Sequence, residues 1–351
     1  MKRVLVTGAG GPAGVNFIRS LRAADEPYYI VGTDIDRYHL EWPDVDVAYE
    51  APRSNEPGYV DFLNDVIERE SVELLHPQPD GEVRVISENR DDLQARTFLP
   101  SRESIRICQD KHESARVWAE KGVQRTESIL IETREDLERA AEQLGLPFWL
   151  RATEGAGGLG STPVDQVDVG LHWIQYWRMR GKEWQFVAHE LLGGRNLAFT
   201  SLWHEGRIVC SQVRERLEYI YPYLAPSGVT GTPVLAVTRK RPDVDDIATR
   251  AVQAIDPQAS GVWSVDLKED SEGIPRPTEV NCGRFFTTSY FFTAAGVNIP
   301  DMYVRLGFGE ELPELPPYSL LDDGIYWIRH IDCPAVLRTD ADLRAIPLDR
   351  R

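Results

Sequence analysis

The chain has 351 residues, with 56 acidic against 39 basic side chains and a formal net charge of −17 at pH 7. This length predicts a sizeable core and two or three domains, whereas the negative charge argues against general attraction to nucleic acid or to an anionic membrane. The four cysteines form no CxxC pair and no apolar run approaches about 20 residues, so we expect a soluble cytoplasmic protein without disulfides, signal peptide or membrane anchor.

Residues 1–107 are predicted to form an open α/β domain. An apolar strand at residues 4–7 leads through a glycine-rich turn at residues 8–14 into a helix, and a second strand ends at Asp34. This alternation is typical of a parallel sheet. The glycines and Asp34 are also similar to a dinucleotide-binding fingerprint, although Gly14 comes one place late. An NAD-dependent oxidoreductase therefore stays open as an alternative.

The next segment combines helix signals with a second glycine-rich loop. Asp110 is a candidate N-cap for a helix that starts at Lys111, and a strand at residues 148–150 delivers Arg151 to the loop at residues 155–161. Glycines allow backbone amides to point inward around phosphate, and a nearby arginine adds a charge-assisted donor. The alternative is an ordinary surface turn.

Two strand-like runs follow, at residues 186–192 and 197–203. The turn at residues 193–196 begins with two glycines, which predicts that the two strands form a hairpin. The sequence contains no GxSxG or HExxH motif, which argues against serine-hydrolase and zinc-protease chemistry.

A third pair of runs carries hard oxygen ligands. Residues 262–267 end a strand at Asp266, and a turn-rich connection leads back through Glu279 to Asn281, so we expect antiparallel strands that bring the two carboxylates together. Residues two apart on a strand share a face, so Glu279 and Asn281 would converge on one Mg²⁺ ion. Arg284 follows, and a carboxylate, an amide oxygen and a guanidinium within six residues suit Mg²⁺ and phosphate. Solvated acidic residues near strand ends are the alternative.

Taken in chain order, these features resemble the ATP-grasp superfamily, and most closely the carboxylate-amine ligases related to the carbamoyl-phosphate synthetase large chain. The resemblance spans about residues 1–310. It rests on Asp110-Lys111, residues 147–151, the loop from Gly155 to Ser161, Glu190 with Gly194, Asp266, and Glu279-Asn281-Arg284.

The resemblance implies ATP and Mg²⁺ as cofactors and a role for each motif. Lys111 and Arg151 would contact the phosphates, and Arg284 and Arg151 would be catalytic. The implied nucleotide and metal residues are Gly155, Gly157, Gly158, Gly160 and Ser161 in a mobile lid, Glu190, Leu191 and Leu192 at the adenine, Asn196 at the ribose, and Asp266, Glu279 and Asn281 at the magnesium. Tentative substrate residues are Gly10 and Gly11, by resemblance, and Arg214, Arg216, Thr230 and Gly231.

The candidate acceptor region consists of Arg214, Arg216, Thr230 and Gly231. Arg214 or Arg216 would fork onto a substrate carboxylate, and the turn at Thr230 and Gly231 would offer backbone amides to it. Solvated arginines on a strand face are the alternative.

Three positions depart from the family pattern. Asn196 stands where a ribose-binding Glu is usual, and Arg151 replaces the commoner Lys. Cys282-Gly283 inserts one residue before Arg284, which a bulge at the glycine would compensate.

The expected fold is therefore α/β, an ATP-grasp fold with an N-terminal Rossmann-like pre-grasp domain. We expect this domain at 1–107, the small lid subdomain at 108–186, the large subdomain with the metal site at 187–312, and a C-terminal extension packed on the grasp domain at 313–351. The expected function is ATP-dependent amide formation from a small-molecule carboxylate and amine through an acyl phosphate, in a possible homodimer without nucleic-acid or membrane partners. Alternatives are phosphorylation of a carboxylate or bicarbonate with another acceptor, or a nucleotide-binding regulatory protein without catalysis.

Overall fold

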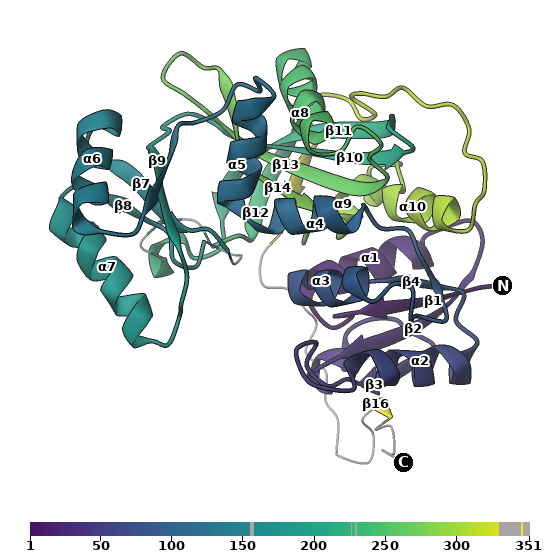
Figure 1. The fold of residues 1–351 in the computed structure, drawn as a ribbon. Coiled ribbons are helices and arrows are strands. Elements are labelled where there is room, and N and C mark those ends of the chain that lie inside the picture. The colour runs from purple at the N-terminus through teal and green to yellow at the C-terminus, as the bar shows by residue number, and fades with distance from the viewer. Residues whose placement is uncertain (155–157, 226, 229, 330–344, 347–351) are drawn as a thin grey trace.

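The computed structural model describes residues 1–154, 158–225, 227–228, 230–329 and 345–346. Its strands form three separate sheets, and Figure 1 shows the smallest sheet at one end, the N-terminal sheet at the other and the third sheet between them. Within the described ranges, no helix is long and apolar enough to cross a membrane.

The N-terminal sheet is parallel and has the strand order β16-β3-β2-β1-β4-β5. Helices cover it, as the alternating pattern of the sequence predicts. Its elements are β1 (Lys2–Thr7), α1 (Pro12–Arg22), β2 (Tyr28–Asp34), the 3₁₀ helix η1 (His39–Glu41), β3 (Val47–Glu50), α2 (Tyr59–Glu70), β4 (Leu74–His76), α3 (Asp80–Glu88), β5 (Arg96–Thr97) and β16 (Ala345–Ile346).

The large sheet is antiparallel, with the order β14-β13-β10-β11-β12-β15. Its strands are β10 (Asn196–His204), β11 (Arg207–Tyr219), β12 (Pro233–Arg239), β13 (Gly261–Glu269), β14 (Pro275–Cys282) and β15 (Tyr326–Ile328). The helical elements of this part of the chain are α4 (Arg102–Gln109), α5 (Lys111–Glu120), η2 (Pro222–Leu224), α8 (Pro242–Ile255), α9 (Tyr290–Ala294) and α10 (Ile299–Gly307). The Trp118 indole on α5 donates to the Ala251 carbonyl on α8 at 2.9 Å, so α5 is fixed to the large sheet through its neighbour.

The small sheet has the order β6-β9-β7-β8 and carries two helices. Its elements are β6 (Ser128–Ile131), α6 (Arg134–Leu144), β7 (Phe148–Ala152), β8 (Thr162–Val164), α7 (Val167–Met179) and β9 (Phe186–Glu190). We call residues 126–190 the small lobe. The start of α6 has the capping box expected from Thr133 and Asp136.

The hairpin predicted across residues 193–196 is wrong. β9 pairs with β6 and β7 in the small sheet, whereas β10 pairs with β11 and β13 in the large sheet. The Gly194 amide instead donates to the Glu269 carbonyl at 3.1 Å, so the two glycines carry the chain from one sheet to the other. The small sheet therefore extends to Glu190, past the boundary at 186 expected from the sequence.

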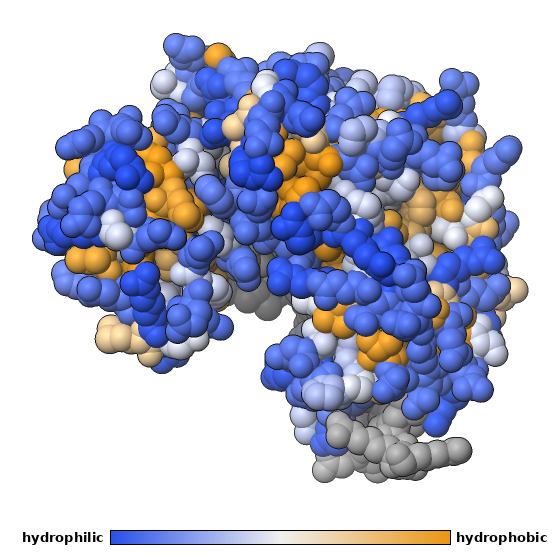
Figure 2. Space-filling model, in the orientation of Figure 1, coloured by the Kyte–Doolittle hydropathy of each residue, from blue (hydrophilic) through white to orange (hydrophobic). Residues whose placement is uncertain are grey.

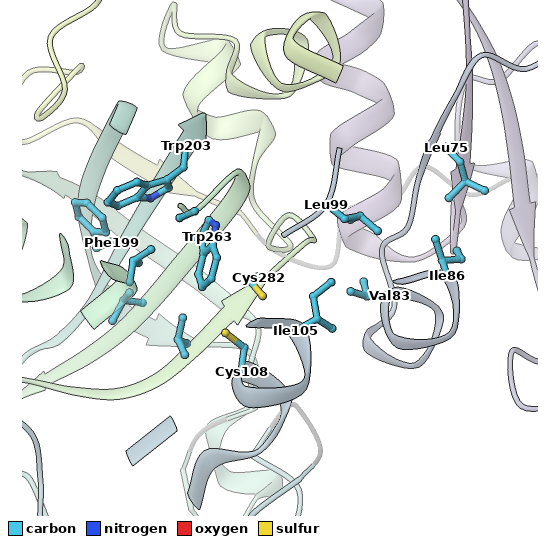
Figure 3. Packing of buried hydrophobic residues seen from close by; sticks show 14 of the residues in the cluster. Leu75, Val83, Ile86, Leu99, Ile105, Cys108, Phe199, Trp203, Trp263 and Cys282 are labelled. Atoms are coloured by element: carbon cyan, nitrogen blue, oxygen red, sulfur yellow. The ribbon is translucent and has the colours of Figure 1, made fainter. Parts of the chain in front are cut away.

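Two of the three sheets share apolar packing. In Figure 3, Val83 and Leu99 of the N-terminal domain lie near Ile105 of α4, and Cys108 faces Cys282 at the end of β14; all five belong to one buried cluster. The small lobe has a buried cluster of its own, centred on Phe148, Leu150 and Phe186. The surface shown in Figure 2 is mainly hydrophilic, with apolar residues in separate small areas. The small lobe is thus a separately packed unit.

Glu82 on α3 gives this fold a measurable pH dependence. The side chain is 5 % exposed, and its carboxyl has a pKa of about 7 instead of the ordinary 4.5. Burial is the main cause and the charge of Asp34 adds to the shift, while the Thr7 and Tyr59 hydroxyls oppose it. A raised folded-state pKa contributes stability that is complete below pH 4.5 and is lost as the pH rises through 7.

Raising the pH from 5 to 9 should therefore lower the free energy of unfolding of the wild type by up to about 3 kcal/mol more than that of Glu82→Gln. The measurement is urea denaturation at a series of pH values. Parallel pH profiles for the two proteins would contradict this assignment.

Candidate functional site

A cleft of about 280 Å³ lies between the small lobe and the large sheet. Its wall gathers residues from the loop after β7, the end of β9, and one face of β10, β11, β13 and β14. The sequence-predicted residues that line it are Lys111, Arg151, Gly158, Ser161, Glu190, Leu191, Leu192, Asn196, Arg214, Arg216, Gly231, Asp266, Glu279, Asn281 and Arg284. Segments far apart in the sequence therefore converge here.

Strand register explains how the acidic residues meet. Asp266 on β13 lies directly opposite Glu279 on β14, as the turn-rich connection predicts, and Asn281 follows on the same face while Val280 is buried on the other. A register shift sits between Asp266 and Leu267. The two carboxylates and the amide thus share one strand face at the cleft.

Glu279 is contacted by two cations from different parts of the chain. Lys111 Nζ lies 3.8 Å from one carboxylate oxygen, and Arg151 Nη1 lies 3.7 Å from the other. Arg151 also donates to the Thr278 carbonyl. Burial lowers the pKa of Arg151, and the charges of Glu279 and Asp266 oppose that shift. The result is a half-buried carboxylate between two positive groups.

Asp266 has an arginine partner of its own. Arg216 forks onto its two oxygens at 2.9 and 2.6 Å. Burial lowers the pKa of Arg216, but the attraction of Asp266 outweighs it and the net shift is upward. The sequence predicts that Arg214 or Arg216 faces a substrate carboxylate; in this arrangement the planar fork of Arg216 already holds Asp266.

Arg284 is kept at the cleft despite the extra residue before it. Gly283 has a left-handed backbone with φ +78°, its amide donates to the Val262 carbonyl at 3.0 Å, and the chain then turns Arg284 back toward Asn281. Arg284 Nη2 donates to Asn281 Oδ1 at 2.8 Å, and the guanidinium also forks onto Asp80 of α3. Burial lowers the pKa of Arg284, yet Asp80 reverses this and the net shift is upward.

Four predicted residues are not on the cleft wall. Gly10 packs against His39, where an added Cβ would lie 2.7 Å from the His39 backbone, and Gly11 closes the turn by bonding to the Gly8 carbonyl. Gly160 is directed toward its own lobe and away from the cleft, and its carbonyl accepts from the Trp173 indole at 2.9 Å. The Thr230 hydroxyl donates to the Ile220 carbonyl.

Gly155 and Gly157 lie outside the described residues, so the structure says nothing of their place in the lid.

The dinucleotide-binding alternative loses support from the geometry of Asp34. Its carboxylate accepts from the amides of Gly10 and Asp36, both at 3.0 Å. Asp34 therefore holds the glycine turn in place, and its side chain is 7 % exposed. In this arrangement both oxygens of Asp34 serve the backbone of the turn.

Sequence reasoning missed several lining residues. Ser264 and Lys268 stand two positions either side of Asp266, so the alternation of a strand predicts them on the same face. Phe286 and Thr287 follow Arg284 in an irregular segment, and no periodic signal identifies them. His189 also lines the cleft; burial, with Arg151 nearby, lowers its pKa and favours the neutral ring.

No protein-family model matches the sequence, and a search of curated proteins finds no match. Solved structures do match the fold. Carboxyaminoimidazole ribonucleotide synthase from Aspergillus clavatus, complexed with ATP, has a TM-score of 0.68 at 15% identity over 90% of this chain and 79% of its own. The biotin carboxylase domain of a Hydrogenobacter thermophilus 2-oxoglutarate carboxylase, with MgADP and bicarbonate, has a TM-score of 0.70 at 16% identity over 93% of this chain and 73% of its own.

An L-amino acid ligase from Bacillus licheniformis has a TM-score of 0.66 at 13% identity, over 88% of this chain and 74% of its own. Each of these likenesses covers most of this chain. They confirm the ATP-grasp fold that the sequence predicts.

The backbone at Gly283 can be tested against a matched glycine. Gly283 and Gly273 have φ of +78° and +79°, but an added Cβ would lie 3.1 Å from Val83 at Gly283 and would meet nothing within 4 Å at Gly273. Each Gly→Ala change should cost about 1–2 kcal/mol for the left-handed backbone, and Gly283→Ala should cost more. Chemical denaturation of both variants measures this, and equal losses would contradict the crowding.

Proposed function

We propose that this chain, which has the ATP-grasp fold, is an ATP-dependent ligase that joins a small-molecule carboxylate to an amine. The observation that carries the proposal is the placement of Lys111 and Arg151 on the two oxygens of Glu279 within one cleft. Cations grouped around carboxylates at a cleft between lobes suit a metal-bound polyphosphate.

In the proposed reaction, a carboxylate oxygen of the substrate attacks the γ-phosphorus of ATP. The bond from that phosphorus to the β–γ bridging oxygen breaks, and ADP leaves. The amine nitrogen then attacks the acyl carbon, loses a proton and displaces inorganic phosphate, which leaves an amide. The protein supplies position and charge neutralisation and needs no nucleophile of its own.

The cations divide this work by their place in the cleft. Lys111 and Arg151 are the proposed ligands of the ATP phosphates, since both already face the Glu279 carboxylate on β14. We call β13 and β14, which carry Asp266, Glu279 and Asn281, the metal strands. Arg284, which Asp80 and Asn281 hold in position, is proposed to stabilise the transferred phosphoryl group. Residues 190–192 and Asn196 also line the cleft and are the proposed contacts of adenine and ribose.

The metal strands fit magnesium by donor chemistry. No group of three or more His, Cys, Asp or Glu side chains in the described ranges is arranged to hold a metal ion. The cleft instead offers two carboxylates and an amide oxygen, from Asp266, Glu279 and Asn281. Mg²⁺ commonly takes only a few protein ligands when phosphates and waters complete its coordination. We propose that these three residues hold the ion, which would neutralise phosphate charge when bound.

The small lobe is proposed to shield the reaction from water. Its hydrophobic cluster is separate from those of the other two sheets, and Gly158, Leu159 and Ser161 of its loop line the cleft. An acyl phosphate hydrolyses if water reaches it, so a lobe that closes over the site protects the intermediate.

The proposal is tested by ADP and phosphate release from Mg²⁺-ATP across a panel of carboxylates and amines, with products identified by mass spectrometry. We expect release that depends on both partners and a product lighter by one water than their sum. Nucleotide binding without turnover across the panel would favour a regulatory protein, and release with a carboxylate alone would favour a phosphorylating enzyme with another acceptor.

Glu279→Gln is the sharpest variant of the metal strands. It removes one negative charge at the point that Lys111 and Arg151 share, so ADP release should fall on the order of 100-fold or more. Glu272→Gln, an exposed change on the turn between the same two strands, is the matched control and should keep wild-type turnover. Circular dichroism should show both variants folded; wild-type turnover in Glu279→Gln would reject the site.

A further inference from the structure

Arg214 is a buried cation that has no carboxylate partner within the described ranges. It lies on β11 and is 1 % exposed, and no Asp or Glu in the described residues is within ion-pair distance of its guanidinium. Its one hydrogen bond in this part of the chain runs from Nη1 to Thr288 Oγ1 at 2.7 Å, and its Nε has no partner. Burying a charge on these terms is costly.

The neighbouring arginines of the cleft differ in this respect. Arg151 faces Glu279, Arg216 forks onto Asp266, and Arg284 forks onto Asp80. Burial, followed by the repulsion of Arg216, lowers the pKa of Arg214 well below its ordinary value, and Asp266 opposes this only in part. Among the residues that the structure describes, no negative charge therefore lies beside Arg214.

The Arg214 side chain is also held in a fixed orientation. Its guanidinium carbon lies 3.5 Å from the centre of the Phe286 ring, and both residues line the cleft. The ring covers one face of the guanidinium, and Thr288 fixes one edge. A planar guanidinium held in this way is prearranged for a planar oxyanion such as a carboxylate.

Sheet register places Arg214 away from the metal strands. Arg214 lies opposite Ala198, Ala198 opposite Asp266, and Asp266 opposite Glu279, so the four form one row across the sheet. Opposed residues share a face, and strands lie about 4.8 Å apart, so the backbone of Arg214 is about 10 Å from that of Asp266 and about 14 Å from that of Glu279 along the row. Ala198 leaves only a methyl group between the cation and the carboxylates.

We infer that Arg214 binds a carboxylate of the substrate that does not itself react. The group that accepts the phosphoryl lies at the metal strands, and Arg214 holds a second anionic group on the same face farther along the row. The substrate that enters here therefore carries a carboxylate besides the reacting group: either the acid is a dicarboxylate, or the amine is an amino acid. This inference rests on the proposed ligase function.

The first test needs no substrate. If Arg214 is kept for binding, Arg214→Met removes an uncompensated buried charge, and the thermal unfolding midpoint of the unliganded protein should stay the same or rise. Arg216→Met on the same strand is the matched control: it strips Asp266 of its partner and should lower the midpoint. A midpoint for Arg214→Met that falls as far as that of Arg216→Met would show a structural arginine and overturn the inference.

The second test uses acetate and succinate as probes on protein loaded with MgADP. Both anions should raise the midpoint of the wild type above that in chloride at equal ionic strength, and the gain should vanish in Arg214→Met. Binding of MgADP, measured by calorimetry, should be unchanged in this variant. No carboxylate-dependent gain in the wild type, or an equal gain in the variant, overturns the inference, whereas failure to bind MgADP in the wild type would reject the ligase function instead.

Steady-state kinetics identify whether the acid or the amine carries the non-reacting carboxylate. Succinate is compared with succinamate as the acid, and L-alanine with L-alaninamide as the amine. For the substrate that Arg214 binds, replacing its carboxylate by an amide should raise its KM about 10-fold or more with the wild type. The same replacement should leave that KM unchanged with Arg214→Met, and the KM for ATP should stay constant throughout. Retained discrimination in the variant would overturn the inference.

Discussion

Lys111 and Arg151 approach opposite oxygens of Glu279, at 3.8 and 3.7 Å, from separate parts of the molecule. Lys111 begins α5, which packs on the large sheet, while Arg151 belongs to β7 of the small lobe. The carboxylate is thus the point at which the lobes are electrostatically joined. The Lys111 amide also donates to the Thr153 carbonyl at 3.0 Å, so the same junction fixes the start of the glycine loop.

This junction matters because the buried apolar clusters of the described residues do not join the small lobe to the large sheet. The N-terminal sheet and the large sheet are joined through packed apolar side chains around Val83, Ile105 and Cys282, as Figure 3 shows. The small lobe packs around its own cluster, so polar contacts at the cleft must fix its position. A ligand that competes for Glu279, Lys111 or Arg151 therefore acts directly on the placement of the lobe.

The sequence is informative where the determining contacts are local. The pairing of Asp266 with Glu279 could be predicted because a turn-rich connection joins their strands, and the caps at Asp110 and Thr133 depend on neighbours within three residues. The strand partner of β9 could not be predicted, because two glycines indicate a change of direction but not which strand the chain meets next. The difference between Arg214 and Arg216 is likewise set in three dimensions: one finds Asp266, the other Phe286 and Thr288.

The pairing of β16 with β3 bears on how the protein is made. Residues 345–346 add a strand beside residues 48–49, so two segments from opposite ends of the sequence complete one parallel sheet. On the ribosome, β3 emerges long before β16, because the strands of the other two sheets are synthesised in between. Its unpaired edge during that interval is open to other extended chains, and the N-terminal sheet is complete only after residues 345–346 have been made.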